Sequence, residues 1–119
     1  MVRALIDTNV LIDFLSGHEK ARMELERHAR PAISIITWME VLVGAAPHEE
    51  STIRRWLDSF EHIGVDDRVA GRAVVIRRDR RIRLSDAIIW ASAQIHGMLL
   101  VSRNHRDFPT DALDVRVPY

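Results

Sequence analysis

Near the start of the chain stands LIDTNVLID, residues 5–13, in which an acid, Asp7, directly follows an apolar run. An amide, Asn9, comes two residues later. Such a run is typical of a buried parallel strand, and its carboxyl end opens into the crevice where α/β sheets bind ligands. Because burying part of a charge is unfavourable without a partner such as a metal ion, Asp7 is a candidate functional residue.

The chain has 119 residues, no cysteine and equal numbers of acids and bases, 17 of each. This length predicts one domain, residues 1–119, and a composition that is 47% hydrophobic is typical of globular proteins. The lack of cysteine excludes disulfides, zinc–thiolate sites and thiol catalysis. We expect a cytoplasmic protein, since no run approaches a membrane span of about 20 apolar residues and acids interrupt the amino-terminal run too early for a secretory signal.

The bases are concentrated in the second half of the chain, and 16 of the 17 are arginine. Residues 72–83 contain six arginines and a single acid, Asp79. Arginine binds phosphate bidentately through its planar fork, so this tract is a candidate surface for a polyanion. The alternative is that it forms the solvated face of a helix.

Short apolar runs alternate with helical patterns along the whole sequence. Strands are expected at residues 2–6, 32–35, 63–65, 98–102 and 115–117. Helices are expected at residues 10–15, 19–28, 38–45, 49–60, 68–78 and 87–96, with Asp66 and Ser85 as N-caps and Gly97 just past the last helix. The pattern predicts a three-layer α/β/α sandwich with a parallel sheet, and an order of 3-2-1-4-5 would create a switch point beside the first strand.

Several polar residues stand where this fold would bring them to one edge of the sheet. Asp7 ends the first strand, Glu40 lies in the first turn of the helix after the second strand, and Asp86 opens the last helix. Asn104 follows the fourth strand, with Asp107 three residues further on. In a switch-point sheet all of these side chains would meet in one crevice.

Each of these residues also has a purely structural interpretation. Asp7 and Asn9 could form a turn that starts a helix, and Thr37 with Glu40 could form a capping box. Asp86 would stabilise the positive end of its helix, and the remaining two could be loop residues. Taken together, however, carboxylates gathered at one edge repel one another unless a cation neutralises them. An oxygen-rich set without thiols suits Mg²⁺, with Mn²⁺ as a substitute.

The sequence resembles the PIN-domain ribonucleases of the VapC toxin type. The matching stretches are IDTNVLID at 6–13, SIITWMEVLVG at 34–44, RRIRLSDAIIWASA at 80–93 and LLVSRNHRDF at 99–108. The resemblance spans essentially the whole chain in the right order. It implies a Mg²⁺-dependent endoribonuclease that cleaves RNA phosphodiesters and pairs with a cognate antitoxin.

The family's three principal acids fall on Asp7, Glu40 and Asp86, whereas its fourth acidic position falls on Asn104. This departure favours one tightly held metal ion, with Asp107 acting through a bridging water. We expect Asp7 and Asp86 to bind the metal and Glu40 to hold a water or act as a base. The expected supporting or substrate-binding residues are Thr8, Asn9, Ser102 and Arg103.

Two other classes of function remain open. One is a metal-dependent phosphohydrolase with Asp7 as nucleophile, against which Asn9 counts because it replaces the second acid of a DxD pair. The other is a catalytically weakened module that binds RNA or protein, which the departure at Asn104 favours. The aromatic residues Trp38, Trp56 and Phe60 are expected in the core. Their alternative role is a homodimer face or a groove for an amphipathic partner helix.

Overall fold

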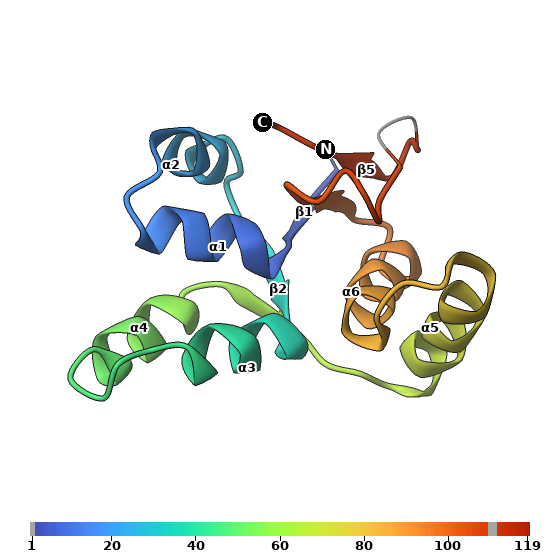
Figure 1. Ribbon diagram of the computed structural model, residues 1–119, viewed down its shortest axis with the longest axis horizontal. Helices are drawn as coiled ribbons and strands as arrows, with labels where there is room; N and C mark the ends of the chain where they lie inside the picture. The colour runs from blue at the N-terminus through green and yellow to red at the C-terminus, as the bar shows by residue number, and fades with distance from the viewer. Residues whose placement is uncertain (1, 110–111) are drawn as a thin grey trace.

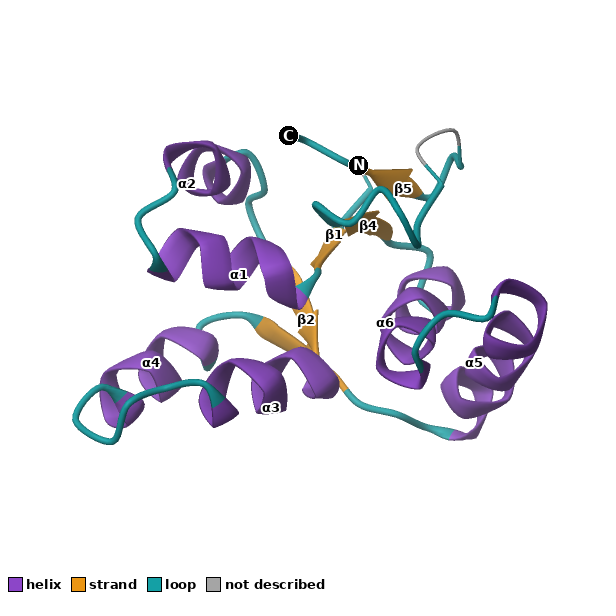
Figure 2. Cartoon of the chain, viewed as in Figure 1, coloured by secondary structure: helices purple, strands orange, loops and turns teal. Residues whose placement is uncertain are grey.

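The computed structural model describes residues 2–109 and 112–119. Within these residues a parallel five-stranded sheet has the order β3-β2-β1-β4-β5 and carries helices on both faces (Figures 1 and 2). The strands are β1 (Ala4–Ile6), β2 (Ala32–Ser34), β3 (Glu61–Ile63), β4 (Leu99–Val101) and β5 (Val115–Arg116). The helices are α1 (Thr8–Leu15), α2 (Glu19–Glu26), α3 (Ile35–Val43), α4 (Glu50–Leu57), α5 (Asp67–Arg80) and α6 (Leu84–Ile95). The predicted α/β/α architecture and strand order are confirmed.

The sheet separates two hydrophobic cores because successive strand residues point to opposite faces. Leu5 packs with α5 and α6, whereas its neighbours Ala4 and Ile6 pack with α1 to α4. Figure 1 shows α5 and α6 on one side of the sheet and the other four helices on the opposite side. Both faces are therefore covered, which is why the central strands read as continuous apolar runs.

The register of β1 and β4 fixes what lies at the carboxyl edge of the sheet. Ile6 is paired with Val101, and the Asp7 backbone N–H continues the ladder by donating to the Val101 carbonyl at 2.8 Å. Asp7 and Ser102 are thus the first residues beyond two adjacent strands. Helix α3 begins directly after β2 at the same edge, so the edge is formed by three neighbouring strands.

Three local predictions are wrong, each because an element begins earlier than its apolar pattern. Helix α3 is capped by the Ser34 hydroxyl, which accepts from the Ile36 N–H, so the capping box expected at Thr37 does not form. Helix α6 begins at Leu84 after Arg83, not after Ser85. Strand β3 begins at Glu61, which pairs with Ala32. Its first two residues, Glu61 and His62, are polar and exposed at the sheet edge, so they do not belong to the apolar run from which the strand was predicted.

Two predicted helix boundaries are confirmed, the start of α5 and the end of α6. Asp66 caps α5 by accepting from the Val69 N–H at 2.9 Å, and Gly97 follows the α6 C-cap with a positive φ of 64°. In the described part of the chain, no helix has both the length and the apolar character that a membrane crossing needs.

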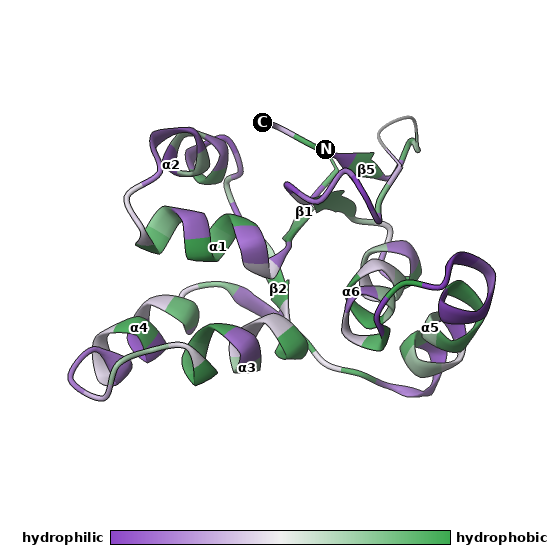
Figure 3. Ribbon diagram, in the orientation of Figure 1, coloured by the Kyte–Doolittle hydropathy of each residue, from purple (hydrophilic) through white to green (hydrophobic). Residues whose placement is uncertain are grey.

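The arginine tract lies on the end of α5 and the segment that leads to α6. Its six arginines are all exposed, and Figure 3 shows this end of α5 as strongly hydrophilic. Arg81 ends the helix in the left-handed conformation with a φ of 55°. Both interpretations of the tract, a polyanion-binding surface and a solvated helix face, require this exposure.

Candidate active site at the carboxyl edge of the sheet

Asp7 is the buried centre of the candidate site. Only 3% of the residue is exposed, yet it carries a carboxyl group at the end of β1. Burial raises the pKa of Asp7 to about 6, hydrogen bonds from Ser102 and Thr8 oppose this, and the charges of Asp86 and Glu40 reinforce it. The charges of Glu40, on α3, and of Asp86, on α6, thus both act on Asp7, which directly follows β1.

Thr8 connects the Asp7 carboxylate to Glu40. Its backbone N–H donates to Asp7 Oδ1 at 2.7 Å, and its hydroxyl donates to Glu40 Oε1 at 2.7 Å. The buried Thr37 hydroxyl lies 2.9 Å from the Thr8 hydroxyl. Glu40 is therefore oriented by α1 and by its own helix, and the corrected start of α3 at Ile35 removes capping as its explanation.

Asp86 lies in the first turn of α6 and is also buried, with 4% exposure. Its Oδ2 accepts from Arg83 Nε at 3.1 Å across one helical turn. Asp7 likewise serves as the N-cap of α1, accepting from Thr8 N–H. The structural roles expected for Asp7 and Asp86 at helix starts are thus present together with the convergence of the acids, so the two interpretations do not exclude each other.

Ser102 and Asn9 hold the Asp7 carboxylate from the side of β4. The buried Ser102 hydroxyl donates to Asp7 Oδ2 at 2.7 Å and accepts from the Asn104 N–H at 3.0 Å. Asn9 Nδ2 lies 3.3 Å from both Asp7 Oδ2 and Ser102 Oγ, while its Oδ1 accepts from Arg103 N–H at 3.1 Å. The Asn9 side chain therefore donates through its nitrogen and accepts through its oxygen at the same time, and an ionised aspartate has no such donor.

Asn104 and Asp107 form a single hydrogen-bonded unit after β4. Asn104 Nδ2 donates to Asp107 Oδ2 at 3.0 Å, and Asn104 Oδ1 accepts from the Asp107 N–H at 3.2 Å. Both polar atoms of the Asn104 side chain are engaged in this way. The carboxylate at this corner of the site belongs to Asp107, whose charge acts on Arg83.

Arg103 is the predicted site residue whose side chain has another partner. Its Nε donates to Asp13 Oδ2 at 2.6 Å, and the Tyr119 hydroxyl donates to the same oxygen at 2.8 Å.

Sequence reasoning missed the contact of Arg83 with Asp86 because it treated Arg83 as part of the arginine tract. The spacing of three residues between Arg83 and Asp86 was the available signal, since such residues are neighbours on a helix.

The donor chemistry of the site fits a hard divalent cation. Its acids offer oxygen atoms only, and a bound cation would favour the ionised form of Asp7, whose pKa is raised mainly by burial. Across residues 2–109 and 112–119, no three His, Cys, Asp or Glu side chains already stand as a ready-made metal site. A bound cation would therefore have to draw the acids closer together, against the pairing of Asp86 with Arg83.

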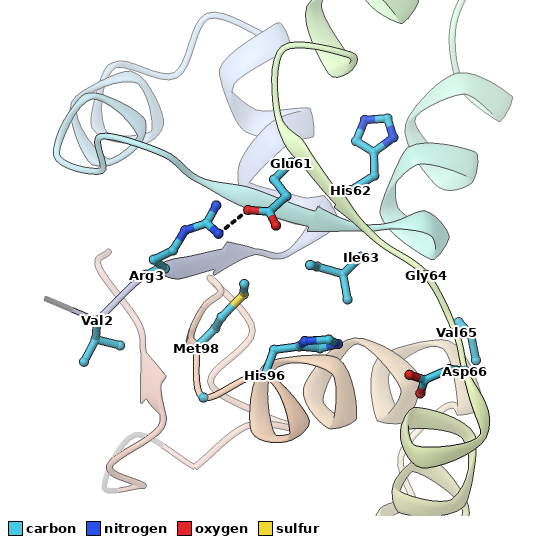
Figure 4. Close-up of a pocket in the computed structure, with 11 residues that line it drawn as sticks. Val2, Arg3, Glu61, His62, Ile63, Gly64, Val65, Asp66, His96 and Met98 are labelled. Carbon is cyan, nitrogen blue, oxygen red and sulfur yellow. Dashed lines mark ion pairs between the residues drawn. The ribbon is translucent and has the colours of Figure 1, made fainter.

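A separate cavity of about 840 Å³ lies at the amino ends of β1 and β4 and along β3 (Figure 4). Arg3 and Glu61 form an ion pair in its wall. The other side chains drawn there include His62, Asp66 and His96. Asp7, Glu40 and Asp86 are not among its lining residues, so this cavity is distinct from the candidate site.

The fold and the clustered acids define a class of protein. Residues 4–110 match the PIN domain family, and the chain belongs to that family. The resemblance to VapC-type PIN toxins is confirmed by this match together with the structural similarities that follow. The comparison with curated proteins gives no match.

Solved structures from toxin–antitoxin systems share the fold. A chain of a toxin–antitoxin complex from Klebsiella pneumoniae is 44% identical, with 98% of each chain covered and a TM-score of 0.92. A chain of FitAcB from Neisseria gonorrhoeae is 22% identical over 97% of each chain, with a TM-score of 0.80. A chain of DNA-bound VapBC from Salmonella typhimurium is 23% identical, covering 98% of this chain and 96% of that one, with a TM-score of 0.79. The last two similarities establish the fold alone.

Proposed function

We propose that residues 1–119 form a single nuclease domain, a metal-dependent endoribonuclease that acts as the toxin of a toxin–antitoxin pair in the cytoplasm. The observation that carries this proposal is the position of Asp7, Glu40 and Asp86 at one sheet edge, where the charges of Glu40 and Asp86 act on the buried Asp7. Membership of the PIN family and the 44% identity to a chain of a toxin–antitoxin complex support it.

Asp7 and Asp86 are the residues that would hold the metal ion, Mg²⁺ or in its place Mn²⁺. When bound, the ion would lower the pKa of a water molecule and stabilise the charge that develops on the phosphate. Among the described residues, three acids stand at this edge together with Asp107, whose carboxylate is bonded to the Asn104 amide. Because this fourth carboxylate is already engaged, we infer a site for one tightly held ion.

The chain's own residues supply orientation and proton transfer. Glu40, held by the Thr8 hydroxyl at 2.7 Å, would accept the proton of the attacking water as a general base. Thr8, Asn9 and Ser102 keep the Asp7 carboxylate in a fixed position, which matters because small displacements in a site of this kind lower the rate strongly.

Purified protein incubated with RNA, DNA and p-nitrophenyl phosphate in Mg²⁺ or Mn²⁺ tests the activity. We expect RNA cleavage that EDTA abolishes and that Asp7→Asn and Asp86→Asn each lower by at least about a hundredfold. Asp79→Asn, at an exposed position on α5, removes one negative charge away from the site and should retain activity.

The remaining outcomes separate the other classes of function. Hydrolysis of p-nitrophenyl phosphate without RNA cleavage would replace the proposal with a phosphohydrolase. No cleavage of any substrate, together with tight binding of RNA or a partner protein, would make the chain a binding module.

The antitoxin is proposed to bind an apolar surface on α1 and α3. Ile12, Leu15, Met39 and Val43 are exposed there by 39%, 41%, 43% and 86%. A groove of about 450 Å³ between α1, α3 and α4 is lined by two of them, Ile12 and Leu15, and by Gly44, which follows Val43. An exposed apolar surface of this kind suits the apolar face of an amphipathic helix.

Co-expression with the product of the neighbouring gene tests this surface. We expect Val43→Asp to prevent co-purification of the partner while RNA cleavage persists. We also propose a homodimer, so a second copy of the chain is the alternative occupant of this apolar surface. Sedimentation of the isolated protein distinguishes an antitoxin from a second copy. If a second copy covers the surface, Val43→Asp should convert a dimer to a monomer.

A further inference from the structure

Arg83 is a cation placed among the acids of the candidate site. It occupies the N-cap position of α6, and its Nε donates to Asp86 Oδ2 at 3.1 Å. The two partners differ sharply in environment, since 74% of the Arg83 side chain is exposed but only 6% of the Asp86 side chain. One end of this ion pair is therefore fixed and buried, while the other is a long side chain in solvent.

Three acids from different elements act on this guanidinium. Its pKa is raised first by the hydrogen bond and charge of Asp86, and then by the charges of Glu40 and Asp107. Arg83 thus contacts Asp86 directly and feels the charges of Glu40, on α3, and of Asp107, after β4. The nearby Arg103 is paired with Asp13.

The geometry of the pair leaves Arg83 able to change partners. The bond to Asp86 uses Nε, and a guanidinium has further N–H donors in a fork that matches phosphate oxygens. The buried Asp86 carboxylate needs a cationic partner, and the exposed Arg83 guanidinium is hydrated once another cation takes its place. Asp86 is also one of the two residues expected to hold the divalent cation.

We propose that Arg83 is the internal counter-ion of the acidic site, competing with the divalent cation for Asp86 and binding an RNA phosphate once the cation displaces it. This inference rests on the proposed function, because it assigns a role to Arg83 at the same metal and RNA site. Without metal, the guanidinium reduces repulsion among the acids; with metal, it becomes a positioning residue for the substrate.

Calorimetric titration of the whole chain with Mn²⁺ tests the competition. We expect Arg83→Gln to bind Mn²⁺ about threefold to tenfold more tightly than the unmodified protein, because Asp86 no longer has a competing partner. Arg83→Lys keeps the charge and should stay near the original affinity. Arg78→Gln, on the exposed surface of α5, loses the same charge and should also remain close to it.

Binding of a mixed-sequence single-stranded oligoribonucleotide tests the change of partner. Measured in EDTA and in Ca²⁺, which we use as a non-cleaving ion, the gain in RNA affinity on adding the ion should be at least about threefold smaller for Arg83→Gln than for Arg78→Gln. Circular dichroism confirms that each variant is folded.

The Mn²⁺ and RNA measurements together separate failure of the role of Arg83 from failure of the proposed function. Equal Mn²⁺ affinity for Arg83→Gln and the unmodified protein would overturn the role of Arg83 while leaving the proposed function intact. Tighter Mn²⁺ binding with an unchanged RNA gain would overturn the exchange onto phosphate. If the unmodified protein binds no Mn²⁺, the proposed function itself fails, and the role of Arg83 fails with it.

Discussion

Replacing Asp7 with asparagine should stabilise the metal-free protein at neutral pH, although it removes a central residue of the site. Burial raises the pKa of Asp7 from 3.8 to about 6. Each pKa unit corresponds to about 1.4 kcal/mol, so ionised Asp7 lowers the free energy of unfolding at pH 7 by about 3 kcal/mol. Asparagine is neutral and removes this penalty.

Lost hydrogen bonds offset part of the gain. Asparagine keeps an oxygen for the Thr8 N–H, but its amide nitrogen then faces Asn9 Nδ2 and the Ser102 hydroxyl, which both contact Asp7 Oδ2. At about 1 kcal/mol for each disturbed bond, we expect Asp7→Asn to be more stable by about 1–2 kcal/mol at pH 7.

The pH dependence has a definite sign. Between about pH 4 and pH 6 the folded state binds more protons at Asp7 than the unfolded state, because its folded pKa is the higher one. The contribution of Asp7 to stability is therefore complete below pH 4 and is lost as the pH rises through 6. The advantage of Asp7→Asn should shrink by about 2 kcal/mol between pH 7.5 and pH 4.5.

Urea denaturation in EDTA, followed by circular dichroism at pH 7.5 and pH 4.5, measures these differences. Asp79→Asn serves as the control because Asp79 is exposed, and its effect should lie within about 0.5 kcal/mol at both pH values. A folded Asp7→Asn variant that is less stable than the unmodified protein at pH 7.5 would refute the reasoning, since the ionised carboxylate would then be net stabilising.

Three further predictions concern the metal and the fold. Mn²⁺ affinity should fall about tenfold between pH 7 and pH 5, because the ion must displace a proton from Asp7, and calorimetry measures this. Glu24→Ala should lower the free energy of unfolding by about 2–3 kcal/mol in urea, since the buried carboxylate accepts from Arg116 at 2.7 and 2.9 Å and joins α2 to β5. Gly97→Ala should lower the melting temperature through a loss of about 1 kcal/mol, because the φ of 64° strains any residue with a Cβ.

The sheet was predictable because its central strands are buried on both faces. A strand such as Ala4–Ile6 reads as an apolar run whichever face each residue meets, and the register with Leu99–Val101 then follows from the parallel order. The edge strand Glu61–Ile63 was misplaced because two of its three residues are exposed. Helix starts were misplaced where the N-cap is a strand residue, Ser34, or an arginine, Arg83.

The acids of the site were predictable in kind but not in their contacts. The sequence places Asp7, Glu40 and Asp86 at strand ends or helix starts, and the strand order brings those positions to one edge. Which cation approaches them depends on side-chain direction. Arg83 forms an ion pair with Asp86, whereas Arg103, adjacent to the site in sequence, forms one with Asp13. The periodicity of the sequence does not predict which arginine pairs with an acid of the site.

The asparagine at position nine now has a physical explanation that bears on the number of metal ions. Asn9 donates toward Asp7 Oδ2 and Ser102 Oγ while accepting from the Arg103 N–H, so it connects the segments after β1 and β4. A carboxylate there would repel Asp7 and lose the donor. Asn104 repeats the arrangement by donating to Asp107 Oδ2 and accepting from its N–H. Both amides hold a neighbouring carboxylate in place without adding charge of their own, so the fourth carboxylate, Asp107, is already bonded to Asn104. For this reason we propose that a second cation would bind only together with the phosphate of the substrate.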